Sequence, residues 1–224
     1  MRQRAVLALT LSLAIPGLAA ASGSSGMTSS QPQMRAVTPE EEAIEYYNDG
    51  ISYRDKAAAY EKEAAAETDA KKKAKLEAKA KDKHESSIKK FLTATKRDPR
   101  MFQAWGSLGY AYRVTGNYTA SLEAYAKALE IQPAYTPAIE YRAEAYLGLG
   151  RLDEVKSAYM TLFNTDRKRA DELTSAIDRW LERKKTDPAG IDPVKLDEFG
   201  KWASERKQLA AQTSSLTSGQ ELRW

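Results

Sequence analysis

Few side chains in this sequence could carry out catalysis or bind a metal. Cysteine is absent from the 224 residues, which excludes disulfides, thiolate-ligated zinc, iron–sulfur clusters and a thiol nucleophile. His84 is the single histidine, so a multi-histidine metal site is also excluded. The sequence contains no glycine-rich phosphate loop, zinc-protease motif, nucleophile elbow or EF-hand spacing. We therefore expect no enzyme, no cofactor and no metal; catalysis would have to use carboxylates and tyrosines alone.

The polar clusters that remain are explained by helix structure. His84 lies in the lysine-rich stretch KDKHESS, with no second ligand or nucleophile at helical spacing, so we expect a solvated surface histidine. Glu40, Glu41 and Glu42 follow Pro39, and acidic residues in this position stabilise the N-terminus of a helix. Neither cluster predicts a metal site.

Lysines are concentrated in one stretch of the chain, at Lys71, Lys72, Lys73, Lys75, Lys79, Lys81 and Lys83. One interpretation is a surface that binds an anionic lipid, lipopolysaccharide or nucleic acid. The other is a solvated helix face, which we favour because acids are interleaved at Glu61, Glu63, Glu67, Glu77, Asp82 and Glu85. No aromatic residue alternates with the lysines, which argues against nucleic acid bound by base stacking.

The first residues have the three parts of a secretory signal peptide. Arg2 and Arg4 precede an apolar run over residues 5–15, and small residues follow at positions 19–21. The run is shorter than the roughly 20 apolar residues that span a bilayer. We predict a cleaved signal over residues 1–21, a disordered Ser/Gly-rich leader over 22–37, and a bacterial protein that is periplasmic or secreted.

Residues 102–133 contain a helix–turn–helix pattern with aromatic and small residues at fixed spacing. The pattern consists of Trp105, Leu108, Gly109, Tyr112, Gly116, Tyr118, Leu122, Tyr125, Ala128 and Pro133. It resembles the tetratricopeptide repeat (TPR), a unit of 34 residues. Trp105, Leu108 and Tyr112 share one helix face, and Gly116 lies in the expected turn. The arrangement is similar to that of small exported bacterial TPR proteins.

Weaker copies of the pattern lie on both sides. Downstream, residues 136–169 keep Tyr146, Gly150 and Tyr159 in register. Upstream, Gly50 matches the first helix and residues 88–99 match the second, but an insertion of about 25 residues separates the two halves. The insertion is rich in Ala, Lys and Glu, which favour helix, and its turn is predicted at residues 68–69.

We therefore predict an all-α fold, a TPR-like helical-hairpin solenoid of about three repeats over residues 38–165. The first repeat has an elongated helical hairpin, which projects over residues 57–86 and has an alanine-lined seam. A helix begins at Thr38, where Glu41 completes a capping box. Residues 166–212 are predicted to form a capping helix pair, and residues 213–224 a loose tail.

The resemblance implies a groove lined by the first helix of each repeat. The positions that would face it are Tyr47, Ile51, Arg54, Gln103, Gly106, Tyr110, Arg113, Glu140 and Glu144. The lysines and asparagines that hold a chain-end carboxylate in the best-known clamp of the family are missing. Tyr47 and Tyr110 could instead pack between helices, and Arg113 could pair with Glu144 rather than meet a partner.

The expected function is a non-enzymatic interaction or scaffold module of the bacterial cell envelope. The groove would bind a peptide or partner helix of mixed charge, with Glu140 and Glu144 as an acidic wall. Two alternatives remain. The hairpin could pair with its copy in an oligomeric spacer, or the lysine run could bind an anionic envelope lipid or polymer.

Overall fold

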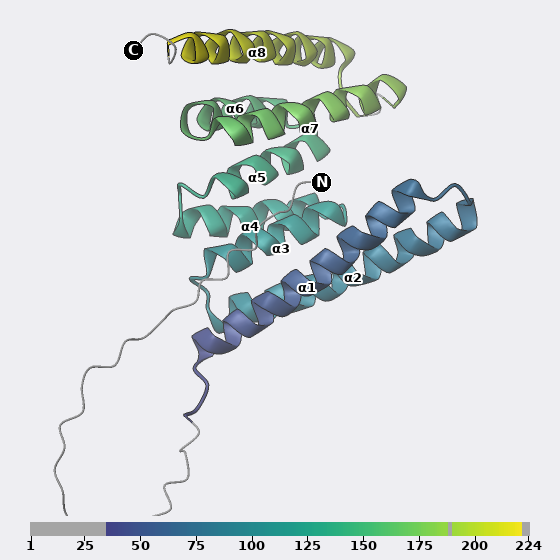
Figure 1. Cartoon of the computed structure of the whole chain (residues 1–224), viewed down its shortest axis with the longest axis vertical. Coiled ribbons are helices and arrows are strands. Elements are labelled where there is room, and N and C mark those ends of the chain that lie inside the picture. The colour runs from purple at the N-terminus through teal and green to yellow at the C-terminus, as the bar shows by residue number, and fades with distance from the viewer. Residues whose placement is uncertain (1–34, 188–189, 221–224) are drawn as a thin grey trace, which may run out of the picture. The chain divides into compact units, whose positions relative to one another are not determined.

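The computed structural model describes residues 35–187 and 190–220, with side chains as far as residue 213. From Val37 onward these residues form one compact unit. They contain eight α-helices and no strand, so the all-α solenoid is confirmed (Figure 1). The helices are α1 (Pro39–Ala66), α2 (Ala70–Arg97), α3 (Phe102–Val114), α4 (Tyr118–Ile131), α5 (Thr136–Gly148), α6 (Leu152–Thr165), α7 (Arg167–Thr186) and α8 (Pro193–Gln220).

Helices α1 and α2 form the elongated hairpin, with 28 residues each. At the start of α1, Thr38 Oγ1 accepts from the Glu41 amide at 3.2 Å and Glu41 Oε2 accepts from the Thr38 amide at 3.0 Å. This is the predicted capping box, which satisfies two amides at the helix end. Asp69 caps α2 by accepting from the Lys72 amide. The predicted turn therefore lies where the sequence placed it.

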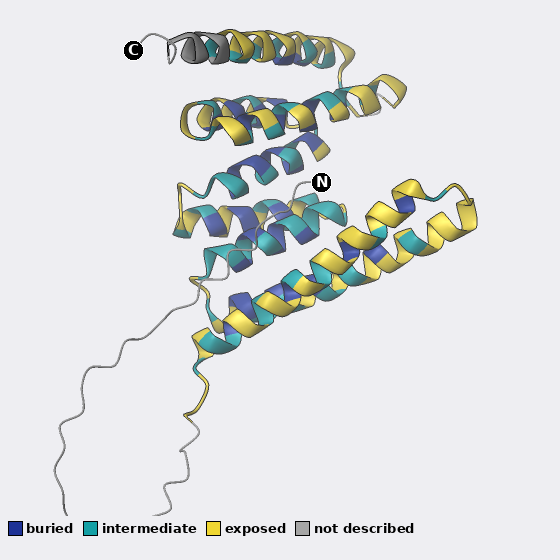
Figure 2. Ribbon diagram, in the orientation of Figure 1, coloured by how far each residue is buried: buried dark blue, intermediate teal, exposed yellow. Residues whose placement is uncertain are grey.

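Buried positions recur along the hairpin, where α1 and α2 face each other (Figure 2). Ala57, Ala64 and Ala80 are buried there. Closer to the repeats, an added Cβ on Gly50 would lie 2.4 Å from the Phe91 ring, so only glycine admits this approach. The predicted alanine seam is thus present, and its small side chains let the two helices approach closely.

His84 corrects the sequence interpretation. It was expected on the solvated surface, but it is only 3% exposed and its Nε2 lies 2.8 Å from Glu61 Oε1 across the seam. The physical reason is its position on the helix: residues 80, 84, 87 and 91 recur at spacings of four, three and four, and all four are buried. The neighbouring lysines occupy other faces of the same helix.

In each of the next two hairpins, α3–α4 and α5–α6, the turn between the two helices contains a glycine with positive φ. Gly116 has φ +82° and Gly150 has φ +68°, one repeat length apart. Within the first of these hairpins, an added Cβ on Gly109 would lie 2.7 Å from the buried Tyr125 ring. Ser121, where the family usually has alanine, donates to the Gly109 carbonyl at 2.8 Å. This buried bond fixes the close crossing of α3 and α4.

Helices α7 and α8 cover the end of the last repeat. One apolar cluster runs through α5, α6, α7 and α8, and its large members include Tyr159, Leu162, Ile177, Trp180 and Phe199. The capping pair is therefore confirmed. Residues 213–220, predicted as part of a loose tail, continue α8 as helix, and residues 221–224 lie outside the described part.

The predicted signal peptide also lies outside the described residues, so its cleavage stays a prediction. In the part of the chain that the structure covers, no helix combines the length and the apolar character needed to cross a membrane.

Candidate functional site

The first helices of the successive hairpins form one layer. Helix α1 contacts α3, α3 contacts α5, and α5 contacts α7. All nine predicted groove residues lie on α1, α3 or α5. The layer is therefore the surface on which a partner site has to be sought, but its residues do not all face solvent.

The residues on α1 contribute mainly to packing. Tyr47 and Ile51 pack against the core cluster of Phe91 and Leu108, and the Tyr47 and Phe91 ring centroids are 5.9 Å apart. Arg54 pairs with its neighbour Asp55 at 2.8 Å. Tyr47 therefore packs between helices, which is one of the two interpretations given for it above.

Gly106 on α3 is covered by an aromatic ring. An added Cβ there would lie 2.7 Å from Tyr135 Cε1, and the residue is buried. Gln103, one turn earlier, remains partly exposed. Of these two predicted residues, only Gln103 has a side chain that remains accessible to solvent.

Tyr110 and Arg113 belong to a compact cluster that joins α3 to α5. The Tyr110 and Tyr141 rings meet edge to face with centroids 5.5 Å apart. The Arg113 guanidinium lies 5.2 Å from the first ring centroid and 5.4 Å from the second. Arg113 Nη1 also donates to Glu144 Oε2 at 2.7 Å. The cluster therefore connects two repeats, and burial raises the pKa of Tyr110.

Glu140 lies deeper in the layer than expected. It is 3% exposed and accepts from Arg169 Nη1 of α7, which also approaches Glu172 Oε2 at 3.3 Å. Burial raises the pKa of Glu140 to about 7, despite the opposing effect of Arg169. The two acids of the expected acidic wall are thus both paired, Glu140 with Arg169 and Glu144 with Arg113.

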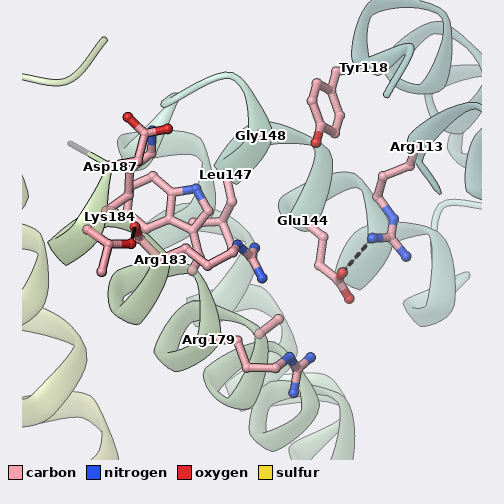
Figure 3. Close-up of a pocket in the computed structure, with 12 residues that line it drawn as sticks. Arg113, Tyr118, Glu144, Leu147, Gly148, Arg179, Arg183, Lys184 and Asp187 are labelled. Carbon is pink, nitrogen blue, oxygen red and sulfur yellow. Dashed lines mark hydrogen bonds and ion pairs between the residues drawn. The ribbon is translucent and has the colours of Figure 1, made fainter. Parts of the chain in front are cut away.

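An open pocket of about 530 Å³ lies beside this cluster, between α5 and α7 (Figure 3). Leu147, Ala176 and Trp180 supply apolar lining, and Tyr118 closes one side next to Gly148. The charged residues that line it are Arg113, Glu144, Arg179, Arg183, Lys184 and Asp187. Four of the six are basic, so the pocket carries a positive balance.

Arg179 and Arg183 were missed by the sequence reasoning, which assigned α7 only a capping role. They are four residues apart, so they share one helix face, and both are exposed. Among the described residues, no carboxylate forms an ion pair with either guanidinium. The spacing could have revealed the pair, but only the packing of α7 on α5 shows that it borders a pocket.

The described residues contain no group of three or more acidic or histidine side chains that could hold a metal ion. What this face offers is a layer of helices with a cationic pocket, partly apolar inside. Such a pocket can hold a ligand through burial and oriented charge.

Comparison with known proteins identifies the repeat. Residues 102–135 match the family model of the tetratricopeptide repeat. Superkiller complex protein 3 of Homo sapiens is 30% identical over 79 residues, which cover 35% of this chain and 5% of that protein. Superkiller protein 3 of Saccharomyces cerevisiae is 31% identical over 70 residues, covering 31% of this chain and 5% of that protein. The chain thus spans about 5% of the length of these curated relatives. The resemblance to the family is confirmed, and the family is generally non-enzymatic.

Proposed function

We propose that this chain, which carries a tetratricopeptide repeat, is a non-enzymatic interaction or scaffold module that binds a peptide or partner helix on its layer of first helices. The observation that carries the proposal is the open pocket between α5 and α7 on that layer. Its volume of about 530 Å³ lies within the roughly 300–1,000 Å³ common for ligand sites.

The rest of the layer supports a site at this end. Toward α1, Tyr47, Ile51 and Gly106 are packed or covered. Toward α7, the layer has both apolar lining and charged groups at the pocket rim. Protein interfaces combine these features, an apolar centre that excludes water and a polar rim that sets orientation.

We further propose that the protein works in the bacterial cell envelope after removal of residues 1–21. Arg2, Arg4 and the small residues at 19–21 support this location. The intact mass of the protein from the periplasmic or culture fraction should correspond to a chain that starts at Ser22. A chain that keeps Met1 and stays in the cytoplasm would contradict the proposal.

Binding on the first-helix layer is tested by site-specific photo-crosslinking in the producing cell. A photoreactive residue at Gln103 should form a partner adduct, because this position is partly exposed on α3. The same residue at Lys127, which is exposed on α4, is the matched control and should not. Adducts from position 127 alone would place the partner on the other layer.

A third position tests the alternative in which the hairpin forms an oligomeric spacer. Its apolar stripe is already used within the chain, because Ala57, Ala64 and Ala80 are buried in the seam. A photoreactive residue at Lys71 should therefore give no adduct with a second copy of the chain. A chain-to-chain adduct from this position would favour the spacer.

A further inference from the structure

We propose that the pocket between α5 and α7 binds an acidic peptide segment, whose carboxylates are held by Arg179 and Arg183. This inference rests on the proposed function and names the chemistry of its partner. The two arginines lie one helical turn apart on α7, with Cβ atoms roughly 5–6 Å from each other by helix geometry. They can therefore meet two acidic side chains of one segment.

Arg179 and Arg183, like Arg100 and Arg167, have no acidic partner among the described residues, whereas several other arginines do. Arg54 pairs with Asp55, Arg151 with Glu154 and Arg113 with Glu144. Arg169, on the same helix α7, pairs with Glu140 and Glu172. Within the described residues Arg179 and Arg183 have no such acid, although both line a pocket. Their forks of N–H donors are thus available to a carboxylate from outside.

The opposite wall does not neutralise this charge. Glu144 points toward the pocket, but it is bonded to Arg113 Nη1 at 2.7 Å (Figure 3). The Arg113–Glu144 pair is balanced in charge, and each side chain is less than a fifth exposed. The positive charge of Arg179 and Arg183 therefore remains to be met by the ligand.

The inside of the pocket favours a peptide over a simple anion. Trp180 is 5% exposed and Leu147 is 3% exposed, so both belong to the core and give the pocket a small apolar floor. Tyr118 lies against Gly148, where an added Cβ would be 2.4 Å from its ring. A segment that alternates acidic and apolar side chains would place carboxylates on the arginines and an apolar group on this floor.

Two other classes of anion fit less well. A nucleic-acid backbone is charged at every phosphate, whereas this pocket places two arginines beside an apolar floor and a charge-balanced Arg113–Glu144 pair. A membrane presents a flat surface, whereas this site is a concave pocket with residues from α3, α4, α5 and α7 around it. The planar guanidinium matches a carboxylate with two parallel hydrogen bonds, which suits glutamate and aspartate side chains.

The test uses a fluorescent probe peptide of alternating glutamate and leucine with both ends blocked, and the same peptide with glutamine in place of glutamate. Binding to the full chain is measured by fluorescence anisotropy. The wild type should bind the acidic probe and not the glutamine probe, and binding should weaken as salt is raised. The Arg179→Gln/Arg183→Gln variant should bind the acidic probe at least about tenfold more weakly.

The matched control is Lys71→Gln/Lys72→Gln, which also removes two positive charges but lies at the hairpin tip. It should keep its affinity within about twofold. An equal loss in this control would mean that only net charge matters, and unchanged affinity in the arginine variant would exclude the pocket. Displacement of the probe by inorganic phosphate at equal charge concentration would show a simple anion site and overturn the peptide assignment.

The two proposals fail separately. If the arginine variant keeps its circular-dichroism melt and its crosslink from Gln103 but binds the probe like the wild type, the pocket assignment is wrong and the interaction module survives. If Gln103 gives no adduct while the acidic probe still requires Arg179 and Arg183, the pocket stands and the proposed layer-wide function falls.

Discussion

Replacement of Glu140 by glutamine should change how the stability of the protein depends on pH. The Glu140 carboxyl is 3% exposed, and burial raises its pKa from the ordinary 4.5 to about 7. The ion pair with Arg169 acts in the opposite direction, and Glu172 and Glu144 add to the rise. The net effect is that the folded protein holds a proton on Glu140 where the unfolded chain has lost it.

The sign and size follow from proton linkage. A raised carboxyl pKa stabilises the fold fully below the unfolded pKa of 4.5, and this contribution is lost as pH rises through about 7. One pKa unit corresponds to about 1.4 kcal/mol, so the loss between pH 5 and pH 8 is on the order of 2–3 kcal/mol. Glutamine cannot titrate. The free energy of unfolding of Glu140→Gln, minus that of the wild type, should therefore rise by this amount over the range.

The assay is urea unfolding followed by circular dichroism at a series of pH values. Any pH-independent cost of losing the Arg169 bond shifts all points equally and leaves the slope unaffected. Glu123→Gln, an exposed glutamate on α4, is the matched control and should show a flat difference. A flat or falling difference for Glu140→Gln would refute the reasoning, because it would show that Arg169 keeps Glu140 ionised in the folded protein.

Three further outcomes are expected, each measured by urea unfolding. Gly109→Ala should destabilise by about 1–2 kcal/mol because the new methyl meets the fully buried Tyr125 ring, whereas Gly148→Ala should be near neutral because Tyr118 is partly exposed and can move. His84→Ala should lower the free energy of unfolding by about 2 kcal/mol, because the bond to Glu61 is lost and a space is left in the seam. A change near zero would mean that His84 is exposed to solvent. Joining residues 57 and 86 by a short Gly/Asn turn should leave the free energy of unfolding nearly unchanged, since the removed seam is mostly alanine; aggregation would show that the hairpin is needed for folding.

The sequence predicted those features that depend on local spacing. Gly116 and Gly150 indicated turns because only glycine adopts a positive φ without strain, and both have it. Asp69 indicated the hairpin turn because its carboxylate can cap a helix, and it does. These signals need only the residue and its immediate neighbours, so they can be read without knowledge of the fold.

Other features depend on which helix faces which. His84 is surrounded by lysines in the sequence, yet the pairing of α1 with α2 places it in the seam opposite Glu61. Trp105 shares a helix face with the buried Leu108 in the repeat pattern, but it remains partly exposed and donates from Nε1 to the Pro99 carbonyl at 2.9 Å. Burial is a property of the assembled faces, and helical period alone gives only the candidates for it.

Charge is distributed along the layer of first helices in a way that gives α7 its role. Arg113 joins α3 to α5 through Glu144, and Arg169 joins α7 to α5 through Glu140. Each acid of α5 that was predicted to meet a partner is thus used by a neighbouring helix. The next basic residues along α7 are Arg179 and Arg183. They pair with neither of these acids, and both line the pocket. Helix α7 therefore pairs with α5 through Arg169 near its start and places Arg179 and Arg183 in the pocket nearer its end. For this reason we propose a binding site on a helix that the sequence predicted only as a cap.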